Sequence, residues 1–218
     1  MKKKPLILVL GLFLGTLSPG ALEMRGLEIR MAAQNYLATE GVYTPSPWTT
    51  SLGGAALLGF KPGSPWELVP EVDVFAFAYR WYYGRAVPAA LETAGRITAL
   101  HFLVSPTLRF RLYSSSRFHA GLTLSPAVLL RVSLSREEDG KSLNGYFYRE
   151  GRFFYPGAGL YFRWRYFETL GLSLSASAHV PIIGVLAEQQ AYHRPPLWDQ
   201  GVLSFRVGVF LPLGNPVP

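Results

Sequence analysis

Residues 118–135 read FHAGLTLSPAVLLRVSLS, and apolar side chains occupy every second position of this stretch. Successive side chains of a β-strand point to opposite faces, so the alternation gives a strand with one apolar face and one more polar face. The apolar row is Phe118, Ala120, Leu122, Leu124, Pro126, Val128, Leu130, Val132 and Leu134, and the other row includes His119, Gly121, Thr123, Ser125, Arg131, Ser133 and Ser135. Such a strand is typical of a transmembrane β-barrel, with lipid outside and polar groups inside.

The first twenty residues have the three parts of an export signal. A basic start, Lys2–Lys4, precedes an apolar run from Leu6 to Leu17, and the small residues Ser18 and Gly20 follow. The apolar run is shorter than the roughly 20 residues that a spanning helix needs, so we expect a cleaved signal peptide over residues 1–20. Residues 21–218 show no boundary, and we assign them to one outer-membrane barrel domain. The chain has no cysteine, which excludes a lipoprotein anchor and disulfides.

Composition agrees with this class. Apolar residues make up 49% of the chain, but no run of about 18 apolar residues follows the signal, so the apolar content is spread over many short elements. The formal charge of +7 falls to +4 without the three signal lysines, and most of the remaining cations are arginines set singly inside predicted strands. A nucleic-acid-binding protein would carry a contiguous basic stripe, so we predict no nucleic-acid partner.

Eight segments of the chain have strand character. The sequence therefore predicts an all-β fold, an eight-stranded antiparallel up-and-down transmembrane β-barrel, because eight is an even number of strands that can close. Short connections at 61–68, 114–117 and 167–171 alternate with longer ones around residues 44, 88, 139 and 192, as in bacterial barrels with periplasmic turns and external loops. The predicted strands are Gly26–Leu37, Thr49–Phe60, Val69–Trp81, Arg96–Tyr113, Phe118–Ser135, Arg152–Tyr166, Leu172–Ile183 and Val202–Leu213.

Two local motifs resemble known barrel families. The segment Val104–Leu108 (VSPTL), followed by Tyr113, a short turn and Arg117–Phe118, resembles the strand and hairpin of the OmpW family. The segment Tyr155–Tyr161 (YPGAGLY) is similar to the glycine-rich strand of small OmpA/OmpX/OmpW-type barrels. The resemblance implies a small outer-membrane barrel with a hydrophobic passage for small apolar molecules.

Charged residues from strands far apart in sequence share the inward parity near the periplasmic end. Charges inside a narrow barrel are costly unless they are paired, so we predict an ion-pair network that fills the lower lumen and excludes a wide pore. The predicted plug consists of Glu28, Arg30, Glu71, Asp73, Arg109, Arg111, Arg163, Arg165 and Arg206.

Aromatic residues share the same parity nearer the outer mouth. Phe75, Phe77, Tyr79, Phe153 and Tyr155 are predicted to point inward there, with His101, Leu129 and His179 close by. They form either an apolar ligand-binding cup above the plug or ordinary interior packing, and the sequence favours neither interpretation.

Two prolines mark a possible irregularity in the wall. Pro106 and Pro126 lie at nearly equal distances from the turn at Ser115 and Ser116, both on the outward parity, and neither can donate a ladder hydrogen bond. The pair predicts either a bend in the wall, which is the safer interpretation, or a lateral opening for apolar solutes.

Other classes find less support in the sequence. The four histidines and the many serines lack catalytic spacing, no two histidines have metal-ligand spacing, and phosphate-binding motifs are missing, so we expect no enzyme activity and no cofactor. A soluble lipocalin-like barrel would have its apolar face inside and a glycine-tryptophan motif, which is missing around Gly26.

The sequence therefore favours a narrow outer-membrane channel for passive uptake of small hydrophobic molecules. The alternative is a surface adhesin or structural protein acting through loops such as 136–151, where Tyr146, Phe147 and Tyr148 follow acidic residues. The predicted partners are outer-membrane lipid, small apolar solutes and the barrel-assembly machinery during insertion, and host or surface ligands if the loops bind.

Overall fold

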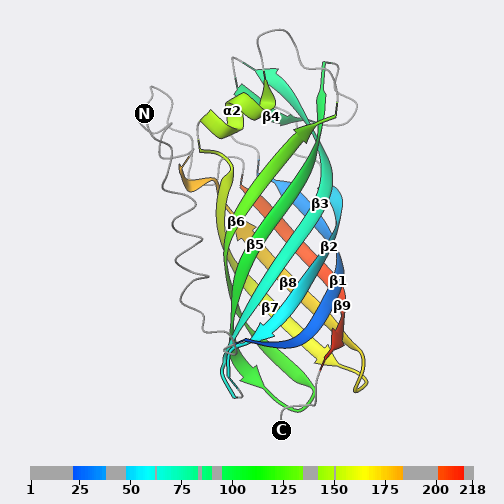
Figure 1. The fold of residues 1–218 in the computed structure, drawn as a ribbon. Helices are drawn as coiled ribbons and strands as arrows, with labels where there is room; N and C mark the ends of the chain where they lie inside the picture. Colours follow the sequence, from blue (N-terminus) through cyan, green and yellow to red (C-terminus); the bar gives the residue numbers. More distant parts are fainter. Residues whose placement is uncertain are drawn as a thin grey trace.

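The computed structural model is a tall β-barrel with a small helix at one end (Figure 1). None of the helices within the part of the chain described here is long and apolar enough to cross a membrane. The structure describes residues 22–37, 48–61, 63–82, 85–89, 95–134, 142–149, 151–183 and 201–213. The predicted signal peptide at 1–20 lies outside these residues and stays a prediction.

Eight antiparallel strands close the barrel. Each pairs with its neighbours in the chain, β3 pairs directly with β5, and β9 returns to β1, so that no edge is left open. These strands are β1 (Glu23–Tyr36), β2 (Trp48–Gly59), β3 (Trp66–Tyr82), β5 (Ile97–Ser114), β6 (Phe118–Ser133), β7 (Phe154–Arg165), β8 (Gly171–His179) and β9 (Val202–Pro212). The predicted fold class is confirmed.

Within the described residues, a strand and a helix are added to the predicted eight strands. Strand β4 (Arg85–Ala89) pairs only with the upper part of β3, and helix α2 (Leu143–Arg149) precedes β7. Both occupy segments that the sequence analysis treated as long loops. Strand β3 also begins at Trp66, three residues earlier than predicted, and β8 ends at His179 rather than Ile183.

The alternation of β6 gives the wall its two faces. Leu124 is 55% exposed on the outer face, whereas the next residue, Ser125, is 4% exposed and faces the lumen. The same alternation runs along β1, where Ile29 and Met31 face outward and Glu28 and Arg30 face inward. An apolar outside and a polar inside are the arrangement of a transmembrane barrel.

One end of the barrel carries short turns, the start of β1 and the end of β9 (Figure 1). Aromatic side chains gather there: Phe118 and Trp164 stack with ring centroids 5.7 Å apart, and Trp66 lies 4.7 Å from Phe110. Aromatic belts mark membrane interfaces, and short turns mark the periplasmic side of bacterial barrels. In the outer-membrane barrel that the sequence predicts, this is the periplasmic end, and we use that name for it.

The cost of a charged side chain on the lipid-facing surface depends on its depth in the bilayer, and this dependence tests which residues face outward. Leu124 lies near the middle of β6 and Leu112 near the periplasmic end of β5, and both face outward. Leu124→Arg should lower the free energy of unfolding in bilayers by about 2–4 kcal/mol, and Leu112→Arg by about 0–1 kcal/mol. Urea titrations in phosphatidylcholine vesicles would measure both, and equal losses would contradict the assignment of the outer face.

Candidate functional site

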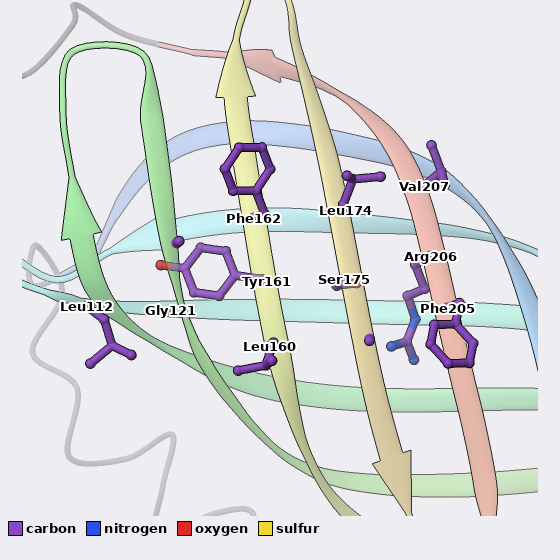
Figure 2. A pocket seen from close by; sticks show the side chains of 12 residues that line it. Leu112, Gly121, Leu160, Tyr161, Phe162, Leu174, Ser175, Phe205, Arg206 and Val207 are labelled. Atoms are coloured by element: carbon purple, nitrogen blue, oxygen red, sulfur yellow. The ribbon is translucent and has the colours of Figure 1, made fainter.

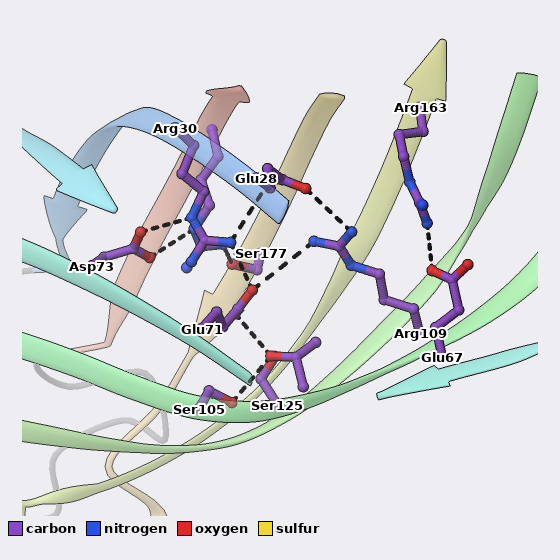
Figure 3. A network of polar contacts seen from close by, with 12 residues as sticks. Glu28, Arg30, Glu67, Glu71, Asp73, Ser105, Arg109, Ser125, Arg163 and Ser177 are labelled. Atoms are coloured by element: carbon purple, nitrogen blue, oxygen red, sulfur yellow. Dashed lines mark hydrogen bonds and ion pairs between the residues drawn. The ribbon is translucent and has the colours of Figure 1, made fainter. Parts of the chain in front are cut away.

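The centre of the lower lumen is a carboxylate shared by two arginines (Figure 3). Asp73 on β3 accepts hydrogen bonds from Arg30 Nε at 2.8 Å and from Arg206 Nε at 2.9 Å. Strand β2 lies between β3 and β1, and its Gly53 leaves the space that the bridge needs, since a Cβ there would come within 2.0 Å of Asp73 Oδ1. All three charged side chains are buried.

A second carboxylate joins this bridge to a group of hydroxyls. Glu71 accepts from Arg30 Nη1 at 2.7 Å and from the hydroxyl of Thr107 at 2.8 Å. The Thr107 hydroxyl also lies 2.8 Å from that of Ser125 and 3.1 Å from that of Ser105. The network therefore continues from β1 and β3 to β5 and β6.

A third cluster includes a residue that the sequence analysis missed. Glu67 on β3 accepts a hydrogen bond from Arg163 and lies 3.9 Å from Arg25, while Glu28 lies 3.5 Å from Arg109. Glu67 had been assigned to a turn, because the start of β3 was placed at Val69. It has the same parity as Glu71 and Asp73, and that signal would have identified it.

The structure brings seven of the nine predicted plug residues into this network and leaves two outside. Arg111 is half-buried and donates to the carbonyl of Ser64 at 2.9 Å, and Arg165 is half-buried nearer the periplasmic end. Neither forms an ion pair with an acid in the part of the chain that the structure describes. The inclusion of Arg111 and Arg165 in the ion-pair plug was wrong, because they lie at the periplasmic mouth.

Aromatic side chains pack the upper lumen. The rings of Phe75, Phe77, Tyr79 and Tyr155 are at most 2% exposed, and Tyr36, which was not predicted, joins them. The Tyr36 ring centroid lies 4.4 Å from that of Phe77, and its hydroxyl lies 2.7 Å from His101 Nδ1. The described rings of this layer are therefore buried and packed against one another.

Phe153 does not belong to this aromatic layer. It lies in the turn before β7, is half-buried and packs on Tyr148 with ring centroids 5.9 Å apart. The prediction failed because β7 begins at Phe154, so the strand alternation does not extend back to residue 153. Phe147, which was expected in an exposed loop, is buried against the barrel core instead.

A buried arginine connects helix α2 to the barrel. Arg131 on β6 donates to the hydroxyls of Tyr79 at 3.0 Å and Tyr155 at 2.7 Å, and to the carbonyl of Arg152 at 3.0 Å. Its guanidinium carbon lies 3.7 Å from the ring centroid of Phe147 on α2, a cation–π contact. Arg131 therefore holds α2 over the outer end of the lumen.

The wall carries a row of four prolines rather than a pair. Pro70 pairs with Pro106 across β3 and β5, and Pro126 pairs with Pro156 across β6 and β7. The register also places Pro106 opposite Pro126, and the β5–β6 ladder is interrupted between Val104↔Val128 and Leu108↔Leu124. At that point neither strand has an N–H to donate, so the seam loses two backbone hydrogen bonds.

A hydroxyl pair spans this interruption from the lumen side. Thr107 on β5 and Ser125 on β6 lie directly beside the two prolines, and their hydroxyl oxygens are 2.8 Å apart. Leu103, Ala127 and Leu129 line the lumen immediately above. An opening at the prolines would therefore lead first to a polar layer and then to an apolar one.

A groove of about 560 Å³ lies on the outer face of β7, β8 and β9 (Figure 2). Leu160, Phe162, Leu174, Phe205 and Val207 surround it, and these side chains belong to the outward rows. The groove therefore opens mainly on the apolar outer face and not on the upper lumen.

The remaining polar lumen groups include a serine and a histidine. The Ser177 hydroxyl lies 3.1 Å from His179 Nε2 and accepts from Arg206 Nη1 at 2.5 Å, and His179 Nδ1 lies 3.2 Å from the carbonyl of Tyr155. Both residues are buried among the plug and the aromatic layer. Within the described residues no group of three or more His, Cys, Asp or Glu side chains could hold a metal ion.

Comparisons with known proteins show the fold. No protein-family model matches the chain, and no curated protein matches it. Among solved structures, Neisserial surface protein A is similar with a TM-score of 0.54 and 7% identity, over 88% of this chain and 99% of that one. Ail of Yersinia pestis gives a TM-score of 0.45 at 10% identity, over 86% and 97% of the two chains. At 7% identity, the likeness to the neisserial protein shows a shared small-barrel fold, and the OmpW resemblance stays a prediction.

The shared carboxylate gives a test of the plug. Asp73→Asn leaves two buried guanidinium groups facing an amide, whose oxygen can accept from one while its N–H₂ group faces the other. The loss of one partner in a buried ion pair costs about 3–5 kcal/mol, and we expect that loss in urea titrations of the folded barrel. Glu168→Gln, at an exposed acid in the β7–β8 turn, should change little. A loss no larger than that of the Glu168 variant would contradict the structural role of Asp73.

Proposed function

We propose that this chain is an outer-membrane protein whose barrel is a sealed anchor for a surface-exposed end. The observation that carries the proposal is that two successive layers fill the lumen. The apolar outer face and the predicted export signal support the outer membrane as its location. The sequence analysis gave a structural or adhesive role as the alternative to a channel, and we now place that role first.

The two layers close the barrel axis in different ways. The lower layer is held by ion pairs between Asp73 and Glu71 on β3 and arginines on other strands, which leave little room for water. The upper layer consists of buried rings that pack against one another, with α2 above them. An ion moving along the axis would need to displace both layers.

The surface-exposed end packs directly against the barrel. Strand β4 extends the sheet through its pairing with β3, and α2 inserts Leu143 and Phe147 into the apolar core. Tyr148 on the same helix remains exposed. This end supports contact with host or surface ligands, since a rigid base holds an exposed aromatic residue in place.

Conductance in planar bilayers tests the sealed barrel. The protein should pass no measurable ion current, and the pair Glu71→Gln with Asp73→Asn should still pass little because the aromatic layer remains. Adding Phe75→Ser and Phe77→Ser should produce a current, since both layers are then open. A steady current through the unmodified, folded protein would contradict the proposal, and retained heat-modifiable gel mobility would show that each variant is folded.

A second candidate function is the passive uptake of small apolar solutes through the wall. The specific observation in its favour is the β5–β6 seam, where Pro106 and Pro126 remove two ladder hydrogen bonds at one level. A gap in the ladder is costly in hydrocarbon, where water cannot replace the missing hydrogen bonds. Strands β5 and β6 would also separate most easily at this gap. The route would pass the Thr107–Ser125 hydroxyl pair and end at the apolar layer around Leu103 and Leu129.

The proline row supplies its own control for this candidate. Pro106→Val with Pro126→Val restores both donors to the β5–β6 seam, so uptake of an apolar fluorophore into vesicles should slow. Pro70→Val with Pro156→Val changes the same number of prolines at the same level, but their restored donors point toward β2 and β8. That control should leave uptake unchanged, and equal uptake in all three proteins would remove the lateral route.

A further inference from the structure

The lower lumen holds more positive than negative charge. The four acids Glu28, Glu67, Glu71 and Asp73 already have arginine partners, as described above. The arginines that face the same space outnumber them, even when only described residues are considered. These arginines are Arg25, Arg30, Arg109, Arg111, Arg163, Arg165 and Arg206.

The excess charge is concentrated at the periplasmic mouth. Arg111 on β5 and Arg165 on β7 have no carboxylate partner within the described barrel, and Arg25 on β1 reaches Glu67 only at 3.9 Å. His119, on β6 between β5 and β7, pairs directly with Arg163 in the ladder. Arg25 therefore lies across the mouth from Arg111 and Arg165, because β1 is opposite β6, the strand between β5 and β7, in the closed barrel.

Hydrogen-bond donors at this mouth are also left over. The Nε atoms of Arg109, Arg163 and Arg165 are buried and have no hydrogen-bond partner among the described residues, and the same is true of the Tyr161 hydroxyl. An unmade hydrogen bond at a buried polar group costs about 1–3 kcal/mol, and more for a charged group. Several such groups together favour an occupant that accepts hydrogen bonds and carries negative charge.

Tyr161 is fixed within this cluster. Its side chain is 4% exposed, and the guanidinium carbons of Arg109 and Arg163 lie 5.2 and 5.7 Å from its ring centroid. The ring lies across Gly121 on the neighbouring strand, where a Cβ would come within 2.9 Å of it (Figure 2). Gly121 thus provides the space in which the Tyr161 ring sits between two arginines.

We propose that the periplasmic mouth binds a phosphate-type oxyanion among Arg111, Arg165, Arg163 and Tyr161. Guanidinium groups present parallel N–H donors that match the oxygens of a phosphate, and a tyrosine hydroxyl adds a neutral donor. Glu67 pairs with Arg163 and Glu28 with Arg109 (Figure 3), and no plug carboxylate pairs with Arg111 or Arg165 among the described residues. The site is separate from the surface end and does not depend on the proposed function.

A phosphate at this position has two possible sources. One is a soluble phosphate compound of the periplasm, and the other is a phospholipid headgroup of the inner leaflet, since Arg165 lies between Trp164 and Tyr166 at the aromatic rim. Both present the same oxyanion to the same side chains. The experiment therefore needs one arm for each source.

The test uses the chain without its predicted signal peptide, in non-ionic maltoside micelles for the first arm and in nanodiscs for the second, at constant ionic strength. In the first arm, inorganic phosphate is titrated and its binding is measured by calorimetry. In the second arm, unfolding midpoints are compared in nanodiscs of phosphatidylglycerol and of a phosphate-free galactolipid. Each arm includes Arg111→Gln with Arg165→Gln, the single variant Tyr161→Phe, and Arg117→Gln as a control for an exposed arginine in the adjacent turn.

Saturable phosphate binding that the double variant weakens about tenfold or more would support a soluble ligand. A higher midpoint in phosphatidylglycerol that the double variant abolishes would support a lipid headgroup. In either case Tyr161→Phe should weaken the effect and Arg117→Gln should leave it unchanged. No binding and no lipid effect, or an equal loss in the Arg117 variant, would overturn the site.

Discussion

The carboxylates of β3 hold the lower half of this barrel together. Glu67, Glu71 and Asp73 lie on one face of a single strand, and their arginine partners come from β1, β7 and β9. Backbone ladders join only adjacent strands, whereas these ion pairs connect strands across the lumen. Because a narrow eight-stranded barrel must fill its interior with side chains, the same contacts also occupy part of the lower lumen.

The outward prolines and the inward hydroxyls act as a unit at mid-wall. Pro106 and Pro126 remove backbone donors from the β5–β6 seam. On the lumen side, the Thr107 and Ser125 hydroxyls form a hydrogen bond across the same seam. Thr107 is in turn held by Glu71, so the ion-pair network reaches the weakest part of the ladder. The strength of the wall at this level therefore depends on the lumen contacts as well as on the backbone.

The alternation of strand side chains between two faces explains what could be predicted from the sequence. Parity alone assigned Glu71, Asp73, Phe75, Phe77 and Tyr79 to the inner face, because each lies well inside a strand where the alternation is unbroken. It failed at strand ends, where Glu67 was taken for a turn residue and Phe153 for a strand residue. The proline row needed the register between strands, and the place of Tyr36, Arg131 and α2 needed contacts between distant segments, neither of which periodicity contains.

The inner row of β3 passes through both layers of the lumen. It changes from acids to aromatic rings after Asp73, so one strand specifies a charged lower layer and an apolar upper layer. The acids lie toward the periplasmic end of β3, near arginines of β5, β7 and β9. The rings lie toward its outer end, near α2. Burial of unpaired arginines is costly, so the arginines beyond the reach of these acids remain at the mouth, where solvent or a bound anion can compensate them. The ion-paired lower lumen and the basic mouth thus have one physical origin, the limited number of carboxylates that β3 and Glu28 supply.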